Sequence, residues 1–216
     1  MIANKLKTAG SPLFVAADVK PNLNIDTAFT ADDTLIESFV AAASDYFEQR
    51  TGRSLMQATY NLRMDDWYYS TDYILELPIA PLLKVVSVKY YDVNNAEQTL
   101  SNSLYRVHNY DTPGFIELFG SLPDIYDRPD AVNIEYVSGY GVDGDNAAAQ
   151  RLAVPARFKQ IIQVMVADYY NWRGNDQALP VYQVSKRLDD LMTEHKVHTS
   201  LFFEFNDAKT SYSRKL

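Results

Sequence analysis

The sequence predicts an α+β fold. We expect a small helical bundle, with one helix on the N-terminal side and two on the C-terminal side, a mainly antiparallel β-sheet inserted between them, and extended terminal arms. Two observations predict this order. Apolar residues recur about every 3.6 positions near residues 31–51 and again beyond residue 154, as in amphipathic helices. Between residues 55 and 141 they instead alternate with polar residues, as in half-buried strands.

The first helix is predicted over residues 31–51. Thr30 followed by Asp33 is a variant of the capping box, and Gly52 supplies a C-terminal stop. One face of this helix is apolar and consists of Leu35, Ile36, Phe39, Val40, Ala43 and Phe47. We therefore expect the helix to pack against another element.

The β region is predicted over residues 55–141. Its clearest strand alternates Tyr60, Leu62 and Met64 with Asn61 and Arg63. Further short strands follow, and the last of them lies in AVNIEYVSGYG. Since turn residues such as Asn94-Asn95 separate these runs, an antiparallel arrangement is favoured.

The segment LPIAPLLKVVSVKYYD, from Leu77 to Asp92, predicts a strand that begins after two prolines. Consecutive strand residues point to opposite faces, so only one of Tyr90 and Tyr91 can face the core. The other is then available to a neighbouring subunit, and the sequence leaves open which one it is.

Helical periodicity resumes after a predicted linker, GVDGDNAAAQRLAV. A helix over residues 154–173 carries Pro155 in its first turn and stops near Gly174, and a shorter helix is expected over residues 180–195.

These elements divide the chain into an N-terminal extension, residues 1–27, a single domain, residues 28–196, and a C-terminal arm, residues 197–216. The arm contains Leu201, Phe202, Phe203 and Phe205. Each such side chain gains about 1.5–3 kcal/mol on full burial. Two interpretations stay open: a frayed terminus with a small docking patch, or an arm that packs on this chain or on a partner.

Composition excludes several classes of function. The 216 residues include 28 acidic and 20 basic side chains, a net charge of −8, which argues against nucleic-acid binding over the whole surface. There is no cysteine, so disulfides and thiolate chemistry are excluded. No stretch approaches the roughly 20 apolar residues of a membrane span. Sixteen tyrosines against ten phenylalanines are typical of proteins with large interfaces.

The search for catalytic, metal-binding and cofactor-binding residues predicts none. The three histidines, His108, His195 and His198, accompany no nucleophile motif, and the last two lack a third metal ligand. Asp143 and Asp145 lie in a loop without the pattern of an EF-hand, so a turn that caps a helix is the better interpretation.

Three carboxylate pairs have structural explanations. Helix capping accounts for Asp32-Asp33, the end of a strand for Asp65-Asp66, and a solvated helix face for Asp189-Asp190. No phosphate-binding loop is present. We therefore predict that the chain is not an enzyme and uses no cofactor or metal.

Several strings occur together in an order similar to the head-to-tail connector, or adaptor, family of tailed bacteriophages and gene transfer agents. They span about residues 32–174, two thirds of the chain, and are DDTLIESFVAAASDYFEQRTGRSL, QATYNLRMD, LELPIAPLLKVVSVKYYD, EQTLSNSLYRVH, VNIEYVSGYG and VPARFKQIIQVMVADYYNWRG. None is a catalytic signature.

The resemblance implies a structural virion protein. Such a protein forms a ring, commonly of about twelve copies, below the portal, joins the DNA-filled capsid to the tail and lines the DNA exit channel. Residues 28–196 would then be the connector domain. The implied partners are the portal protein, tail or stopper and tail-terminator proteins, other copies of the chain, and double-stranded DNA that passes without specific contacts. The implied location is the virion neck, after assembly in the cytoplasm of a bacterial host.

Two sets of residues follow as candidate interfaces. The portal-docking arm is inferred to use Leu201, Phe202, Phe203, Phe205 and Tyr212. Tyr90 and Tyr91 are a possible subunit interface. The acidic net charge suits a channel wall that repels DNA and lets it slide.

Two alternatives come from other classes. A stand-alone ligand- or carbohydrate-binding module would use Trp67, Tyr68 and Tyr69 as a stacking platform. A hydrolase would use Asp65 or Asp66. The apolar tail favours the connector, because a ligand-binding module has no use for it.

Overall fold

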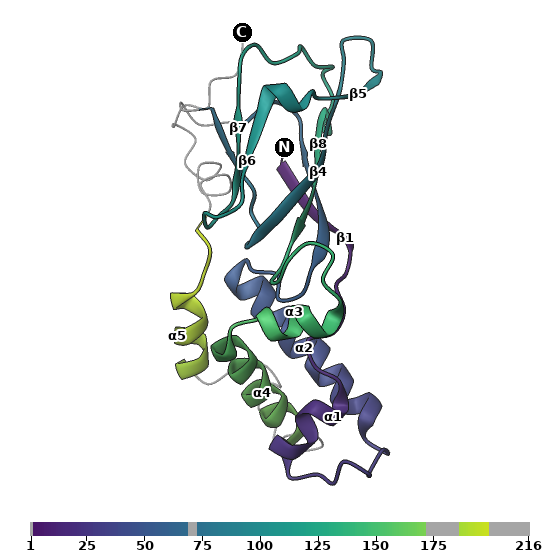
Figure 1. Ribbon diagram of the computed structural model, residues 1–216, viewed down its shortest axis with the longest axis vertical. Helices are drawn as coiled ribbons and strands as arrows, with labels where there is room; N and C mark the ends of the chain where they lie inside the picture. Colours follow the sequence, from purple (N-terminus) through teal and green to yellow (C-terminus); the bar gives the residue numbers. More distant parts are fainter. Residues whose placement is uncertain (1, 69–72, 172–185, 199–216) are drawn as a thin grey trace. The chain divides into compact units, whose positions relative to one another are not determined.

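The computed structural model describes residues 2–68, 73–171 and 186–198 (Figure 1). The chain forms two compact units. The sheet unit comprises Met1–Gly10, Gln57–Gly139 and Val197–Leu216, and the helical unit comprises Ser11–Met56 and Tyr140–Lys196. The sequence analysis treated residues 28–196 as one domain, whereas the structure separates the strands of this range from its helices.

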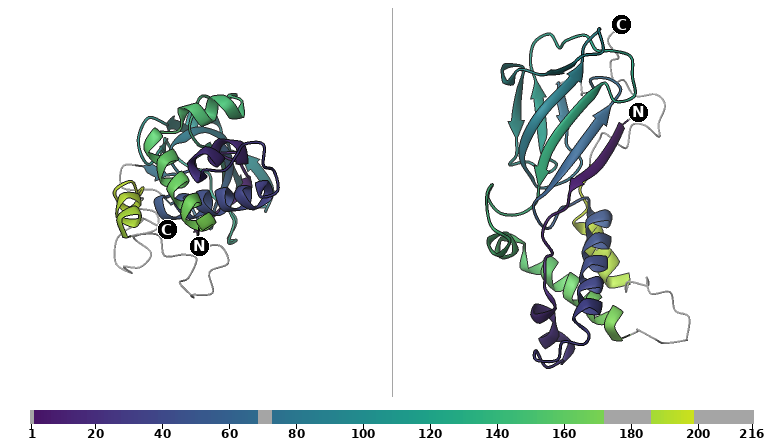
Figure 2. Two further views of the ribbon diagram at one scale, coloured as in Figure 1. Left: turned by 90° about the horizontal axis from the view of Figure 1, so that it is seen from below. Right: turned by 90° about the vertical axis from the view of Figure 1, so that its right-hand side faces the viewer.

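The larger sheet of the sheet unit has five strands in the order β1-β2-β8-β4-β5, all antiparallel to their neighbours. The right-hand view of Figure 2 shows these strands side by side. Their bounds are β1 Ile2–Thr8, β2 Ala58–Met64, β8 Val132–Ser138, β4 Leu82–Tyr91 and β5 Glu97–Thr99.

A second, three-stranded sheet has the order β3-β7-β6 and is also antiparallel. Its strands are β3 Ile74–Glu76, β6 Tyr105–His108, which follows a short 3-10 turn, η2 Asn102–Leu104, and β7 Phe115–Leu118. The prediction of one sheet insertion was therefore incomplete. The short, weakly patterned strands of this region gave no signal for how they pair.

One apolar core joins the two sheets. On β2, the residues Tyr60, Leu62 and Met64 are buried and lie opposite Tyr136, Ile134 and Val132 of β8. Leu75 of β3 and Ile116 of β7, both fully buried, belong to the same cluster. The period-2 alternation thus identified the inward face of the central strands correctly.

The helical unit contains α2 Asp33–Thr51 and α4 Ala156–Asn171, with the smaller elements α1 Ala16–Val19, η1 Lys20–Leu23, α3 Ala147–Ala153 and α5 Lys186–Glu194. The helix α2 ends as predicted at Gly52, whose φ of 68° is left-handed and whose N–H donates to the Glu48 carbonyl.

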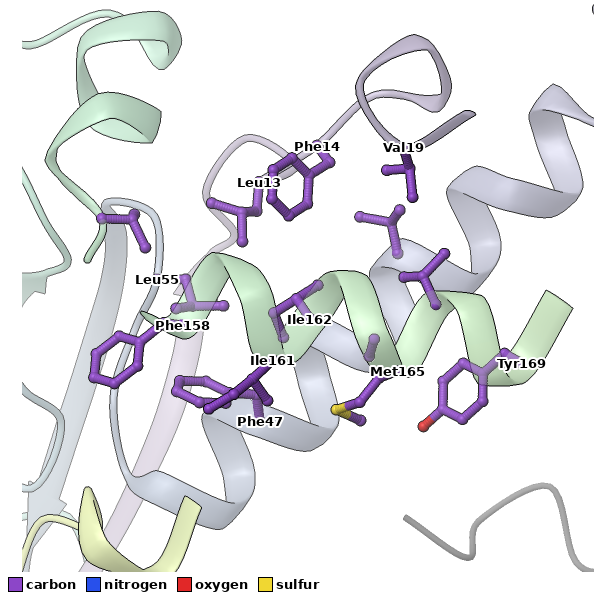
Figure 3. Close-up of a cluster of buried hydrophobic side chains, with 14 of the residues drawn as sticks. Leu13, Phe14, Val19, Phe47, Leu55, Phe158, Ile161, Ile162, Met165 and Tyr169 are labelled. Atoms are coloured by element: carbon purple, nitrogen blue, oxygen red, sulfur yellow. The ribbon is translucent and has the colours of Figure 1, made fainter. Parts of the chain in front are cut away.

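The core of the helical unit lies between α2 and α4 (Figure 3). The Phe47 ring, which is 0% exposed, packs on the Phe158 ring with centroids 5.0 Å apart. Leu13 and Val19 close the same cluster from the N-terminal segment. The predicted apolar face of α2 is confirmed at Ile36, Val40, Ala43 and Phe47, which are buried, whereas Phe39 is half-buried and Leu35 is 38% exposed.

Two sequence predictions were wrong here. Residues 1–27 were expected to form an extended arm, but they contain β1, α1 and η1. Only Ile2 and Leu6 mark the apolar face of β1, with Asn4 between them, so its alternation is too weak to detect. The predicted linker contains the helix α3. Because no residue of α3 is buried, this helix has no apolar period that could be recognised in the sequence.

The two C-terminal helices agree with the prediction where they are described. The helix α4 starts two residues after the predicted residue 154, and α5 occupies Lys186–Glu194 of the predicted 180–195. Within the described residues, no helix is long and apolar enough to cross a membrane.

Candidate assembly surfaces

The histidines and carboxylates that were considered as reactive groups in the sequence make structural contacts in the folded chain. His108 lies in the sheet unit, stacked on Phe115 at 4.4 Å, with its ring nitrogens 2.8 Å from the Tyr110 hydroxyl and 2.9 Å from Glu117. Glu117 also forms an ion pair with Arg106. The His108 imidazole is therefore held in place by Tyr110, just after its own strand β6, and by Phe115 and Glu117 of the adjacent strand β7.

His195 lies in the helical unit, beside two arginines. Its Nε2 is 2.6 Å from a guanidinium nitrogen of Arg157, and its backbone carbonyl accepts from Arg53. Burial and the two positive charges lower the pKa of His195, so the neutral imidazole accepts the hydrogen bond. Among described residues there is no group of three side chains suited to hold a metal ion.

The loop that precedes α3 behaves as the capping interpretation predicts. The Asn146 side chain accepts from the N–H of Ala149, and the Asp145 carboxylate accepts from the N–H of Val142 at 2.7 Å. These side chains satisfy backbone groups of the turn and of the first helical turn.

The carboxylate pairs are only partly explained as predicted. Asp32 is the N-cap of α2 but makes no capping hydrogen bond; it accepts from the Tyr170 hydroxyl at 2.6 Å. Asp33 pairs with the ammonium of Lys20, which is 1% exposed. The capping explanation was thus wrong in its contacts, because both carboxylates bind remote side chains.

The third pair lies on α5 and has a remote partner as well. Asp189 accepts two hydrogen bonds from Arg50 of α2, at 2.8 and 2.9 Å. This fork lowers the pKa of the Asp189 carboxyl.

The residues proposed for a stacking platform do not form one. Trp67 is 7% exposed, its indole N–H donates to the Pro123 carbonyl at 3.1 Å, and its ring lies against Tyr90. The Tyr68 hydroxyl donates to Asp65 at 2.8 Å, and Tyr69 lies outside the described residues. A ring that forms core and donates to the backbone offers no face for a sugar.

The structure decides which tyrosine of β4 faces the core. Tyr90 lies opposite Val132 of β8 and packs on the core of the sheet unit. Tyr91 points to the other face, where the Arg128 guanidinium lies 3.7 Å from its ring centroid. Tyr91 is therefore the candidate for a contact with a neighbour, together with the arginine that covers it. The arm residues Leu201, Phe202, Phe203, Phe205 and Tyr212 lie outside the described residues.

Sequence reasoning missed a basic surface on the outer face of the five-stranded sheet, which we call the basic face. Residues that pair in register share a face, so Lys5, Asn61 and Glu135 form one row across β1, β2 and β8. The neighbouring rows add cations from β2 and β4. The cations of the basic face are Lys5, Lys7, Arg63, Lys84 and Lys89.

This enrichment is not a property of the whole unit. Outside the basic face, the described part of the sheet unit has two cations, Arg106 and Arg128. This part of the unit has eleven carboxylates in all, and of these only Glu97 and Glu135 lie on the basic face. Both are already paired, Glu135 with Lys7 at 2.6 Å and Glu97 with Lys89 at 3.1 Å.

The carboxylates collect instead at one end of the same sheet, which we call the acidic end. The strands β2, β4 and β8 meet there, because Met64, Tyr90 and Val132 lie in one row. The loops that leave this row carry Asp65, Asp66, Asp92, Asp124, Asp127 and Asp130. They are joined to one another: Arg128 donates to Asn95 and Asp130, and Trp67 to Pro123.

The pKa directions at the acidic end agree with stable negative charge. The Arg128 guanidinium beside Asp130 lowers the pKa of that carboxyl. Hydrogen bonds from the Ala96 N–H and the Gln98 amide lower the pKa of Asp92. The basic face and the acidic end are therefore oppositely charged at neutral pH.

The register needed to recognise these surfaces is absent from the sequence pattern. Arg63 was seen as an outward residue of its strand, but the lysines of β1 belonged to no predicted element. A signal exists in hindsight, since lysines at alternate positions are typical of edge strands.

Part of the chain is similar to a family of phage connectors. Residues 17–122 match the family model of the phage gp6-like head-tail connector protein. Among curated proteins, none is similar enough in sequence to count as a match.

Solved structures share the fold over nearly the whole chain. A chain from the neck of an empty gene transfer agent particle, computed with C6 symmetry, superposes with a TM-score of 0.71 at 22% identity, covering 93% of this chain and 98% of that one. A chain from the virion of a native gene transfer agent particle gives 0.69 at 22% identity, covering 92% and 97%. A chain from the neck of the native particle, computed with C12 symmetry, gives 0.61 at 20% identity, covering 90% and 97%.

The matched segment begins in α1 and runs through α2 and the strands β2 to β7, up to the loop after β7. Residues 17–122, just under half of the chain, are thus similar to the phage gp6-like head-tail connector family.

Proposed function

We propose that the chain is a connector ring subunit of a virion neck, which joins a DNA-filled head to a tail. The observation that carries this proposal is the family match over residues 17–122, together with a fold that covers 98% of a chain from a gene transfer agent neck. A head-tail connector acts through contacts with other proteins rather than through chemistry. The core position of Trp67 removes support for a stand-alone ligand-binding module.

The ring is the finer part of the proposal. The similar neck structures were computed with C6 and C12 symmetry, which supports a closed ring of about twelve copies. In this ring, one end meets the portal and the other the tail or stopper proteins, and DNA leaves through the central channel. The ring docks onto the portal through Leu201, Phe202, Phe203, Phe205 and Tyr212.

The test mixes the purified chain with its portal and measures the mass of the complex by native mass spectrometry. We expect a portal ring that carries about twelve copies of the chain. A chain that ignores both the portal and other copies of itself would contradict the connector ring.

A truncation that ends at Val197 tests the docking arm separately. Val197 is 7% exposed and is retained, so we expect an unchanged circular dichroism spectrum and loss of portal binding. A matched control replaces only Tyr73 by Ser, because that side chain is 49% exposed and lies outside the arm. If the truncated chain still joins the portal, the arm does not dock the ring.

A further inference from the structure

The basic face and the acidic end are two surfaces of one sheet that cannot neutralise each other over most of their area. The strands fix the acidic end at the row of Met64, Tyr90 and Val132, whereas the cations extend along the strands to Lys84, opposite Val137. Arg63 lies one row from the acidic end and lowers the pKa of Asp130, where it adds to the larger effect of Arg128.

Charges are left without partners on both surfaces. Within the described part of the chain, no ion pair engages Lys5 or Arg63 on the basic face, nor Asp124 or Asp127 at the acidic end. All four side chains are exposed. Each surface therefore has the charge and the accessibility to receive an oppositely charged partner.

We propose that the basic face of one copy receives the acidic end of the next copy. This inference rests on the proposed ring and names the contact that builds it. Because the two surfaces differ, the contact is heterologous: each copy uses its basic face toward one neighbour and its acidic end toward the other. A contact of this kind repeats around a ring until the ring closes.

A second copy fits the basic face better than DNA does. Glu135 lies in the middle of the face, in the row of Lys5, and Glu97 lies at the β5 edge. Carboxylates inside a contact surface repel phosphates, but in a protein contact they organise the lysines through ion pairs such as Lys7–Glu135. The acidic end provides separate carboxylates spread over three loops, which match separate cations.

The test uses two charge-reversed chains. The face-reversed chain carries Lys5→Glu and Arg63→Glu, and the end-reversed chain carries Asp124→Lys and Asp127→Lys. In each chain alone the substituted side chains meet side chains of the same sign on the next copy, so we expect the number of copies bound per portal to fall and the required chain concentration to rise by about tenfold or more.

Equal mixing of the two reversed chains makes the experiment specific. The substituted positions of one chain then meet oppositely charged substituted positions of the other, and the unsubstituted surfaces pair as in the wild type, so we expect alternating rings with the full number of copies. The quadruple variant, which reverses the charge at all four positions, should also regain assembly. Failure of the mixture and of the quadruple variant, when each reversed chain retains the wild-type circular dichroism spectrum, would overturn the proposal.

Charge controls lie on the strand β6 and in the loop between β6 and β7. Arg106→Glu and Asp111→Lys change the charge of exposed residues outside both surfaces and should leave assembly unchanged. Raising the salt concentration from about 0.05 to 0.5 M should weaken wild-type assembly, because exposed charges are screened.

The outcomes separate this inference from the proposed function. If the wild-type chain forms no ring with the portal, the proposed function fails. If wild-type and both reversed chains all form full rings, only the contact is wrong. If the face-reversed chain forms full rings but loses retention of double-stranded DNA, the basic face is a DNA surface and the proposal is overturned.

Discussion

The two units of this chain are built from the sequence in different ways. The sheet unit takes most of its core from one continuous stretch, Gln57–Gly139, within which the central strand β8 pairs with the earlier strands β2 and β4. The helical unit joins Ser11–Met56 to Tyr140–Lys196, so its core forms only between segments far apart in the sequence. The difference teaches that the helical core needs two segments separated by the whole sheet stretch, whereas most of the sheet core comes from a single stretch.

The largest expected effect comes from removing one of these remote contacts. Phe47→Ala deletes a fully buried ring that packs on Phe158, across the two segments. We expect the free energy of unfolding to fall by about 3–5 kcal/mol, measured by urea denaturation at 222 nm. The control Leu152→Ala, at a side chain that is 81% exposed, should change it by less than about 0.5 kcal/mol.

Hydrogen exchange resolves which unit responds to Phe47→Ala. Faster exchange should be concentrated in residues 33–51 and 156–171. Equal acceleration in β2 and β8 would contradict the view that the two cores depend on separate contacts.

The second effect concerns a buried charge. Lys20→Met keeps the length of a side chain that is 1% exposed but removes the ion pair to Asp33 and the hydrogen bond to the Thr27 carbonyl. Asp33 is left without its cation, so we expect a loss of about 2–3 kcal/mol. In the sheet unit, Lys7→Met removes an exposed pair with Glu135 and should cost less than about 1 kcal/mol. Equal losses of stability in Lys20→Met and Lys7→Met would show that burial of an ion pair does not determine how much it stabilises the fold.

The third effect tests the packing of the sheet unit. A Cβ built on Gly114 would lie 2.4 Å from the Cβ of Leu82, so the strands must move apart to accept Gly114→Ala. We expect a loss of about 1–3 kcal/mol, seen as faster hydrogen exchange in β4 and β7. The double variant with Leu82→Ala should recover part of the loss relative to Leu82→Ala alone; no coupling between the two sites would refute the steric explanation.

The smallest expected effect on stability depends on pH and concerns a buried carboxyl group of the helical unit. Burial raises the pKa of Glu48 from its ordinary 4.5 to about 7, although the Leu55 N–H donates to its carboxylate. The folded chain therefore holds a proton that the unfolded chain releases between these values, and its stability falls as the pH rises across this window. Above about pH 7 the full penalty applies.

Glu48→Gln removes this penalty and keeps an oxygen that can accept from Leu55. We expect it to raise the free energy of unfolding by about 1–2 kcal/mol at pH 8 and to have little effect at pH 4. The matched variant Glu37→Gln, at an exposed position of α2, should show no such pH dependence. A gain for Glu48→Gln that is the same at pH 4 and pH 8 would exclude ionisation as its cause.

The pattern-based predictions worked where one face of an element is apolar and the other polar. The alternation at Tyr60, Leu62 and Met64 and the stripe that contains Val40 and Phe47 both mark buried faces in the structure. In contrast, β1 keeps Asn4 on its inner face, where it accepts a hydrogen bond from the buried Tyr136 hydroxyl at 3.0 Å. A polar residue with a polar partner breaks the pattern, so no period could reveal the strand.

The candidate surfaces were predictable only in part. The strand rule established that Tyr90 and Tyr91 point to opposite faces, but choosing between them required the pairing of β4 with β8. The basic face needed still more, because its cations come from three strands that lie apart in the sequence. Charge patterns of this kind become visible only when the strand order and register are known.

The pairing of β1 with β2 has a consequence for the order in which the chain folds during synthesis. Chains emerge from the ribosome at about 5–20 residues per second, N-terminus first. The strand β1 has no partner until Met64 has emerged, and its Asn4 waits for Tyr136. The sheet unit can close once Ser138 is free, whereas α2 waits for the residues of α4 up to Tyr169. The helix α2 is thus completed later than the sheet unit, and its exposed apolar face is the segment that a chaperone would meet.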